Sequence, residues 1–129
     1  MLGASRGAED TWREATLGIP VDETNDPALL MYQAVLAHKS SLPTDKYLDR
    51  AAELYGELPS NVPLIRKLLA AGDDLDVDDF DFKGELKGVY ARGRGVTYAV
   101  VAMLLGQRAP KQYVTNARTL LFASERPNF

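Results

Sequence analysis

The chain has no cysteine and only one histidine among its 129 residues. Without cysteine, neither a disulfide framework nor a thiolate metal site can form, and a cysteine nucleophile is excluded. The lone His38 has no second histidine or cysteine to complete a metal site, so it is typical of a surface or packing residue. No serine–histidine–aspartate set and no paired-carboxylate spacing is visible. We therefore expect no catalytic activity and no cofactor.

Long hydrophobic runs are also lacking. The longest apolar run, from Ala99 to Leu105, is far too short to cross a bilayer. The beginning of the chain, MLGASRGAED, contains no apolar segment followed by a cleavage signal. These features predict a cytoplasmic protein with no membrane partner.

The remaining composition is that of an ordinary globular protein, with 46% hydrophobic and 26% charged residues. A chain of this length can bury roughly two-thirds of its unfolded surface around one core. We expect an N-terminal arm over 1–20, which holds the only tryptophan, Trp12, and a single helical domain over 21–129. Trp12 is predicted either to pin the arm onto that domain or to dock on a partner.

Helical periodicity dominates the first half of the domain, over 21–72. Asp26-Pro27 is a strong helix start, and a one-faced apolar stripe follows to about Lys39. Thr44 is predicted to cap a second helix that runs to Gly56, and a third extends from about Val62 to Gly72. Short turns between these helices favour an antiparallel bundle. The fold class is therefore predicted to be all-α, with five or six helices.

The next segment, 73–81, is an acidic linker that contains six aspartates. Asp74, Asp76, Asp78 and Glu85 have the spacing of calcium-loop ligands, but Asp79 stands where that loop needs glycine for its sharp turn. A solvated linker is the simplest interpretation. The alternative is an acidic surface that mimics DNA charge or folds over the basic end of the chain.

Beyond this linker we predict a helix from about Asp79, although Gly84 and Gly88 indicate either close approach of another helix or a poorly formed one. Arg92-Gly93-Arg94-Gly95 is then predicted to be a flexible basic hinge. It lacks the motifs of a phosphate-binding glycine loop.

The stretch from Arg92 to Leu121 predicts a C-terminal helix–turn–helix within a basic half, 82–129. Thr97 can cap the first helix, Gly106 can end it, and Pro110 suits the first turn of the second. In the second helix we expect one inward stripe of Val114, Ala117 and Leu121. The opposite face would carry Lys111, Thr115, Arg118 and Phe122. Such a second helix can lie in a DNA major groove.

The same stretch resembles the DNA-binding segment of the alkylguanine-DNA alkyltransferases and alkyltransferase-like proteins. The resemblance rests on Val96-Thr97-Tyr98, Val101-Ala102, Leu105-Gly106, Val114 and Asn116-Ala117, about 25 of 129 residues. It implies that Tyr98 corresponds to a phosphate-side tyrosine that helps to extrude a nucleotide. It also implies that Asn116 corresponds to a polar residue of the recognition helix.

The sequence departs from that family at three points. Gln112 stands where the family has its intercalating arginine, Thr115 stands where it has glycine, and the acceptor Pro-Cys-His-Arg motif is absent. Alkyl transfer to cysteine is therefore excluded.

Charge is divided unevenly along the chain. Residues 1–82 carry 7 Lys/Arg against 16 Asp/Glu, whereas residues 83–129 carry 8 against 2. A basic C-terminal third can meet phosphate, so we predict a small DNA-binding or DNA-associated regulatory protein. The predicted DNA-binding residues are Arg92, Arg94, Thr97, Tyr98, Arg108, Lys111, Gln112, Thr115, Asn116 and Arg118, with Arg126 as a further phosphate contact.

The competing interpretation is a non-enzymatic helical adaptor, assembly or structural subunit. Opposite charge on the two parts of the chain suits head-to-tail self-association, in which the acidic region of one copy meets the basic region of another. The acidic region and the Trp12 arm are the predicted protein-binding parts.

Overall fold

The computed structural model describes residues 11–125, with side chains described as far as Ala123. Within that range the backbone is helical with no strand, which confirms the all-α fold class. The α-helices are α2 (Pro27–Lys39), α3 (Asp45–Tyr55), α4 (Val62–Ala71), α5 (Phe82–Glu85), α6 (Ala91–Leu105) and α7 (Lys111–Glu125). Short 3₁₀ turns occupy η1 (Val21–Glu23), η2 (Gly72–Asp74), η3 (Val77–Asp79) and η4 (Gly106–Arg108).

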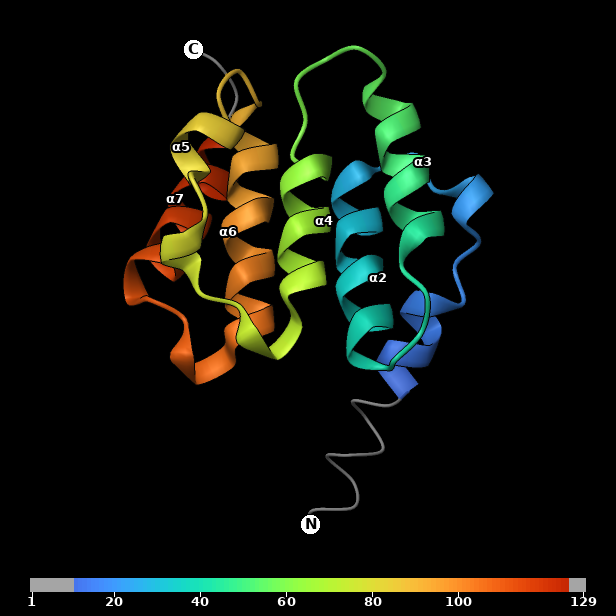
Figure 1. The fold of residues 1–129 in the computed structure, drawn as a ribbon. Coiled ribbons are helices and arrows are strands. Elements are labelled where there is room, and N and C mark those ends of the chain that lie inside the picture. Colours follow the sequence, from blue (N-terminus) through green and yellow to red (C-terminus); the bar gives the residue numbers. More distant parts are fainter. Residues whose placement is uncertain (1–10, 126–129) are drawn as a thin grey trace.

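The helices α2, α3, α4 and α6 lie side by side, while α5 and α7 cover the far side of α6 (Figure 1). Helix α2 is central because it packs against α3, α4 and α6. A continuous core of buried aliphatic side chains runs through these helices. Its most deeply buried members include Leu30, Met31, Leu64, Ile65, Leu68, Val100 and Val101.

The predicted one-faced stripe of α2 is wrong, because this helix is buried around most of its circumference. Leu30, Met31, Ala34, Val35 and Ala37 are all fully buried. Small and apolar residues occupy every side of α2, and a helix with that pattern belongs in the interior. Its predicted start is confirmed, since the Asp26 carboxylate accepts a hydrogen bond from the backbone N–H of Ala28 at 3.0 Å.

The predicted ends of the helices are also confirmed. The backbone turns into the left-handed region at Gly56, Gly72 and Gly106, each with a φ close to +58°. Only glycine adopts this conformation without a steric penalty, so these three positions stop α3, α4 and α6. Thr44 occupies the predicted cap position of α3, but its side chain makes no capping hydrogen bond.

The segment from Asp79 to Gly95 differs from the prediction. Instead of one long helix, Asp81 caps the four-residue α5 by accepting a hydrogen bond from the backbone N–H of Gly84. Gly88 then turns the chain with a φ of +80°. Of the two interpretations of Gly84 and Gly88, the poorly formed helix is therefore correct.

The predicted basic hinge at 92–95 is wrong as well, because these residues lie inside α6. Gly93 and Gly95 are buried where other segments of the chain approach α6 closely. A Cβ atom added to Gly93 would come within 2.8 Å of a Val89 methyl carbon, and one added to Gly95 would come within 2.9 Å of Leu121 Cγ. The glycines therefore serve close packing instead of flexibility.

Thr97 does not cap a helix; it is a buried residue in the middle of α6. Its hydroxyl donates to the Gly93 carbonyl at 2.8 Å and accepts from the Asn61 side-chain amide at 2.9 Å. The same amide donates to the Gly93 carbonyl at 3.1 Å. Asn61 precedes α4, so this buried network joins α4 to α6.

Replacing Thr97 with valine is expected to destabilise the fold by about 1–2 kcal/mol, because one donor of the buried Asn61 amide loses a partner. Thr115 offers a matched control, since its exposed hydroxyl also donates to the carbonyl four residues earlier, at 3.2 Å. Thr115→Val is expected to change the free energy of unfolding by less than about 0.5 kcal/mol. Urea unfolding followed by circular dichroism measures both. Equal effects of the two substitutions would contradict a stabilising role for the buried network.

The predicted arm, 1–20, is described only from residue 11 onward, and 11–17 is helical. This segment and the short α5 bring the described α-helical segments to seven, not five or six. The arm is held by Gln33, whose buried amide donates to the carbonyls of Thr16 and Ile19 at 3.0 and 3.2 Å. Trp12 is 60% exposed, so the prediction that it pins the arm is wrong. No helix among the described residues is long and apolar enough to cross a membrane.

Candidate functional site

The helices α6 and α7 form an antiparallel hairpin. Gly95 and Leu121 touch, although each lies about ten residues, or about 15 Å of helix, from the turn that joins the two helices. Two helices that still touch this far from their connection cross at a shallow angle. In DNA-binding helix–turn–helix units, by contrast, the two helices cross at about 90–120°.

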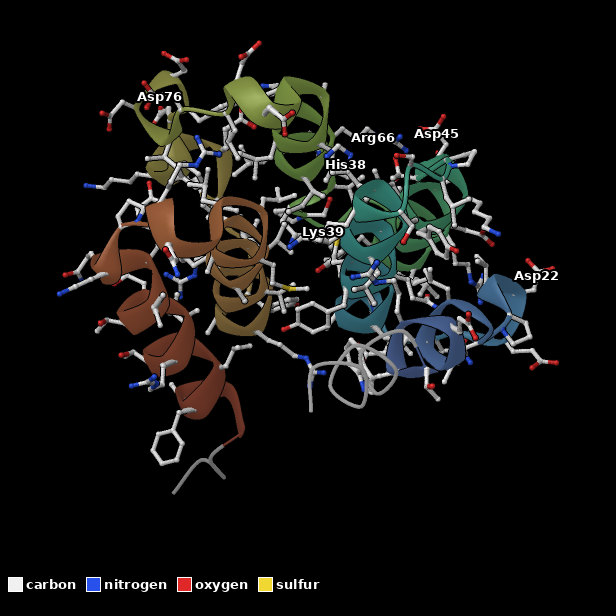
Figure 2. The ribbon with its side chains drawn as sticks, turned by 90° about the horizontal axis from the view of Figure 1, so that it is seen from below. Asp22, His38, Lys39, Asp45, Arg66 and Asp76 are labelled. Atoms are coloured by element: carbon white, nitrogen blue, oxygen red, sulfur yellow. The ribbon has the colours of Figure 1, made fainter. Side chains whose placement is uncertain are left out.

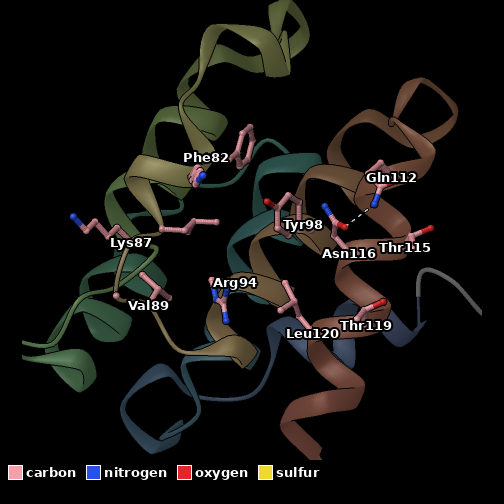
Figure 3. Close-up of a pocket in the computed structure, with 13 residues that line it drawn as sticks. Phe82, Lys87, Val89, Arg94, Tyr98, Gln112, Thr115, Asn116, Thr119 and Leu120 are labelled. Carbon is pink, nitrogen blue, oxygen red and sulfur yellow. Dashed lines mark hydrogen bonds between the residues drawn. The ribbon is translucent and has the colours of Figure 1, made fainter.

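A cleft of about 820 Å³ opens between α5 and α7 (Figure 3). Residues of α5, of the turn after it, of α6 and of α7 line it. The lining residues are Phe82, Lys83, Leu86, Lys87, Gly88, Val89, Arg94, Tyr98, Gln112, Thr115, Asn116, Thr119 and Leu120. This volume lies within the range of pockets that hold small-molecule ligands.

The charges that line the cleft are all positive. Lys83 and Lys87 come from the α5 side and Arg94 from α6, and all three are exposed. Among the described lining residues there is no aspartate or glutamate. The cleft therefore favours an anionic ligand.

The α7 wall of the cleft carries uncharged hydrogen-bonding groups. Gln112, Asn116 and Thr119 lie three or four residues apart, which places them along one face of the helix. The Gln112 amide donates to the Asn116 side-chain oxygen at 2.9 Å (Figure 3). Both amides keep further donors and acceptors with which they can meet a ligand.

Packed aromatic rings support the floor of the cleft. Tyr98 stacks on Phe82 with ring centroids 5.8 Å apart, and Tyr113 meets Tyr98 edge-on at 5.0 Å. Burial raises the pKa of Tyr113, and the neighbouring Tyr98 and Asp78 raise it further. The Tyr113 phenol therefore stays neutral at physiological pH and adds no negative charge beneath the cleft.

Fewer of the described cations form ion pairs in the basic half than in the acidic half. In the acidic half, Arg50 pairs with Glu53, Arg66 with Asp45 and Asp49, and Lys67 with Glu85 of α5. Figure 2 labels Arg66 beside Asp45. Within residues 11–123, the five ion pairs found do not include Lys83, Lys87, Arg94, Arg108, Lys111 or Arg118. The positive charge of the C-terminal third is therefore largely uncompensated.

The structure brings five of the ten predicted DNA-binding residues into the cleft. These are Arg94, Tyr98, Gln112, Thr115 and Asn116. Two more, Lys111 and Arg118, are exposed on α7 without lining the cleft.

The other three predicted residues lie elsewhere. Thr97 is fully buried, so its side chain is not available to a ligand. Arg92 pairs with Asp26 at 3.0 Å, beside a small apolar pocket of about 170 Å³ between α2 and α6. Arg108 lines a shallow depression with Asp73, Asp74 and Asp76, where nearby carboxylates oppose binding of phosphate. Arg126 lies outside the described residues.

Three polar or charged residues of the cleft were not predicted, namely Lys83, Lys87 and Thr119. The two lysines are four residues apart next to the acidic segment, and their association with α7 depends on the turn at Gly88, which the sequence did not place. Thr119 could have been found from its spacing, because it follows Gln112 by seven residues on the same helical face.

The acidic segment 73–81 contains most of the short 3₁₀ turn η2 and all of η3. The Asp76 side chain accepts a hydrogen bond from the backbone N–H of Asp78 at 3.0 Å, so it caps a local turn. Within the described residues, no group of three or more histidine, cysteine, aspartate or glutamate side chains is placed to hold a metal ion.

Comparisons of the chain with protein-family models, curated proteins and solved structures find no match. The fold and the cleft therefore define the protein only as an all-helical protein with a cation-lined cleft.

Proposed function

We propose that this protein binds nucleic acid, DNA in the first instance, through the basic C-terminal half that contains the cleft. The observation that carries the proposal is the charge of the cleft, which combines Lys83, Lys87 and Arg94 with no described carboxylate. Phosphate groups are the commonest anionic partners of such clusters, and their contacts position a nucleic acid without reading its sequence.

The amides of α7 support the same function. Gln112 and Asn116 lie next to the cations, and such amides can make paired hydrogen bonds with base edges. A site for a small inorganic anion would need only the charges. The combination of cations with an amide-rich wall suits a ligand that carries both phosphates and bases.

The proposal predicts binding that is strongly sensitive to salt. If Lys83, Lys87 and Arg94 neutralise about three phosphates, log affinity should fall with log salt at a slope of about −2 to −3. Raising sodium chloride from 50 to 200 mM should then weaken binding about 16- to 64-fold. Fluorescence anisotropy of labelled 12-nucleotide DNA, tested as single strand and as duplex, measures the slope.

The control is the charge-reversed variant Lys46→Glu, which alters an exposed lysine at the start of α3, on a different part of the molecule. It should leave both affinity and slope nearly unchanged, because exposed charges beyond about 10 Å are largely screened. The proposal fails if neither form of DNA binds at 50 mM salt. It also fails if binding is insensitive to salt.

A second candidate function is assembly through the outer face of α7. Two large apolar side chains are exposed there, Val114 at 41% and Phe122 at 55%. Val114 was predicted to face inward, whereas Ala117 of the same stripe is buried as expected. Light scattering distinguishes this candidate, because a concentration-dependent rise in mass that Phe122→Ser abolishes would favour self-association over nucleic-acid binding.

A further inference from the structure

Gln112, Thr115 and Asn116, which were predicted to bind DNA from α7, all line the cleft. Gln112, Asn116 and Thr119 line the cleft between α5 and α7 together with Arg94 and Leu120 (Figure 3). A helix that reads a major groove instead presents its base-contacting side chains on its most prominent exposed face. The exposed side chains of α7 outside the cleft include Lys111, Val114, Arg118 and Phe122, two cations and two apolar residues.

The walls of the cleft differ in chemistry. Lysines occupy the α5 side and uncharged amides and hydroxyls occupy the α7 side, and the half-buried side chains of Tyr98 and Leu120 contribute apolar surface. A single nucleic-acid strand has the same division, since its phosphates lie along one edge, its base edges along another, and apolar base faces between them. In duplex DNA the base faces are stacked and only the groove edges are accessible.

We infer that the cleft binds a single-stranded segment of nucleic acid, with phosphates against Lys83, Lys87 and Arg94 and base edges against Gln112, Asn116 and Thr119. This inference rests on the proposed nucleic-acid function and specifies the form of the ligand. Proteins that bind single strands commonly combine a positively charged groove with aromatic side chains on which bases stack. An intact duplex keeps its base faces stacked, so they are not available to the apolar side chains of the cleft.

The test is a competition experiment on the full chain. A labelled 12-nucleotide DNA strand is displaced by the unlabelled strand, by a 12-base-pair duplex of the same sequence, or by the corresponding RNA strand. We expect the single DNA strand to compete at least about tenfold better than the duplex. RNA that competes as well as DNA would leave the cleft assignment intact and extend the ligand to either nucleic acid.

Substitutions on α7 locate the strand. Asn116→Ala removes a cleft amide and should weaken single-strand binding about 5-fold. This factor corresponds to the loss of one hydrogen bond that contributes about 1 kcal/mol. Thr119→Ala provides a second cleft variant with a similar expected loss. Val114→Ala, on the outward face of the same helix, should change affinity less than about 2-fold.

The outcomes separate the inference from the function on which it rests. If no nucleic acid binds, the proposed function itself fails. If the duplex competes as well as or better than the single strand, the inference fails while the function stands. Loss of binding in Val114→Ala but not in Asn116→Ala or Thr119→Ala would likewise place the ligand on the outward face and overturn the inference.

Discussion

Replacing Arg94 with glutamate is expected to weaken binding of a single-stranded oligonucleotide by at least about 30-fold at 50 mM salt. Arg94 is exposed, lines the cleft and has no partner among the ion pairs of the described residues. The substitution removes one phosphate contact and places a negative charge beside the strand. A combined cost of about 2 kcal/mol corresponds to that loss. Anisotropy titration of the labelled strand measures it.

The matched control is Arg118→Glu, which makes the same change of charge at an exposed position of α7 outside the cleft. We expect it to weaken binding less than about 3-fold, through the general field of the protein alone. Equal losses in the two variants would show that net charge, and not the cleft, governs binding. A larger loss in Arg118→Glu would favour the outward face of α7.

Replacing Gly95 with leucine is expected to destabilise the protein by about 2–3 kcal/mol and to lower Tm by roughly 8–12 °C. Even a Cβ atom at this position would lie 2.9 Å from Leu121 Cγ and 3.1 Å from the backbone nitrogen of Leu121. A backbone atom of α7 cannot move without displacing the helix, so α6 and α7 must separate. Thermal unfolding followed by circular dichroism measures the change.

Ala70→Leu is the control, because it also adds a leucine side chain to a helix, but at an exposed position of α4. It should shift Tm by no more than about 2 °C. If Gly95→Leu is as stable as the parent protein, the close contact between the two helices does not limit the packing of the hairpin. Single-strand binding should also fall in Gly95→Leu, because α7 forms one wall of the cleft.

The sequence predicted those parts of the fold whose signals are local. The Asp26-Pro27 start of α2 and the glycine ends at Gly56, Gly72 and Gly106 are confirmed because a cap or a left-handed turn depends only on neighbouring residues. The all-α class followed from helical periodicity in the same way.

The wrong predictions concern residues whose conformation or role depends on tertiary contacts. Arg92-Gly93-Arg94-Gly95 looks flexible in sequence, since glycine disfavours a helix interior by about 1 kcal/mol. Yet these residues lie inside α6. Glycine is needed at 93 and 95 because Val89 and Leu121 occupy the space that a side chain there would fill. Thr97 likewise resembles a cap in sequence, whereas its real partner, Asn61, is 36 residues away.

The candidate site was predicted only in part, because some of its residues are brought together by tertiary contacts. Gln112 and Asn116 lie four residues apart on α7, so these two could be grouped from spacing alone. Their alignment with Lys83 and Lys87 depends on the turn at Gly88, which brings α5 across from α7. The resemblance to the alkyltransferase segment stays a prediction, although its Tyr98 and Asn116 both line the cleft.

The most direct test of the cleft as a nucleic-acid site is a ¹⁵N-resolved NMR titration of the protein with a 12-nucleotide DNA strand. We predict that the largest shifts fall on the cleft residues of both walls, Lys83, Lys87, Arg94, Gln112, Asn116 and Thr119. Resonances of α3 should not move. Shifts confined to the outward residues Val114, Arg118 and Phe122, or no shifts at millimolar DNA, would contradict the assignment of the cleft.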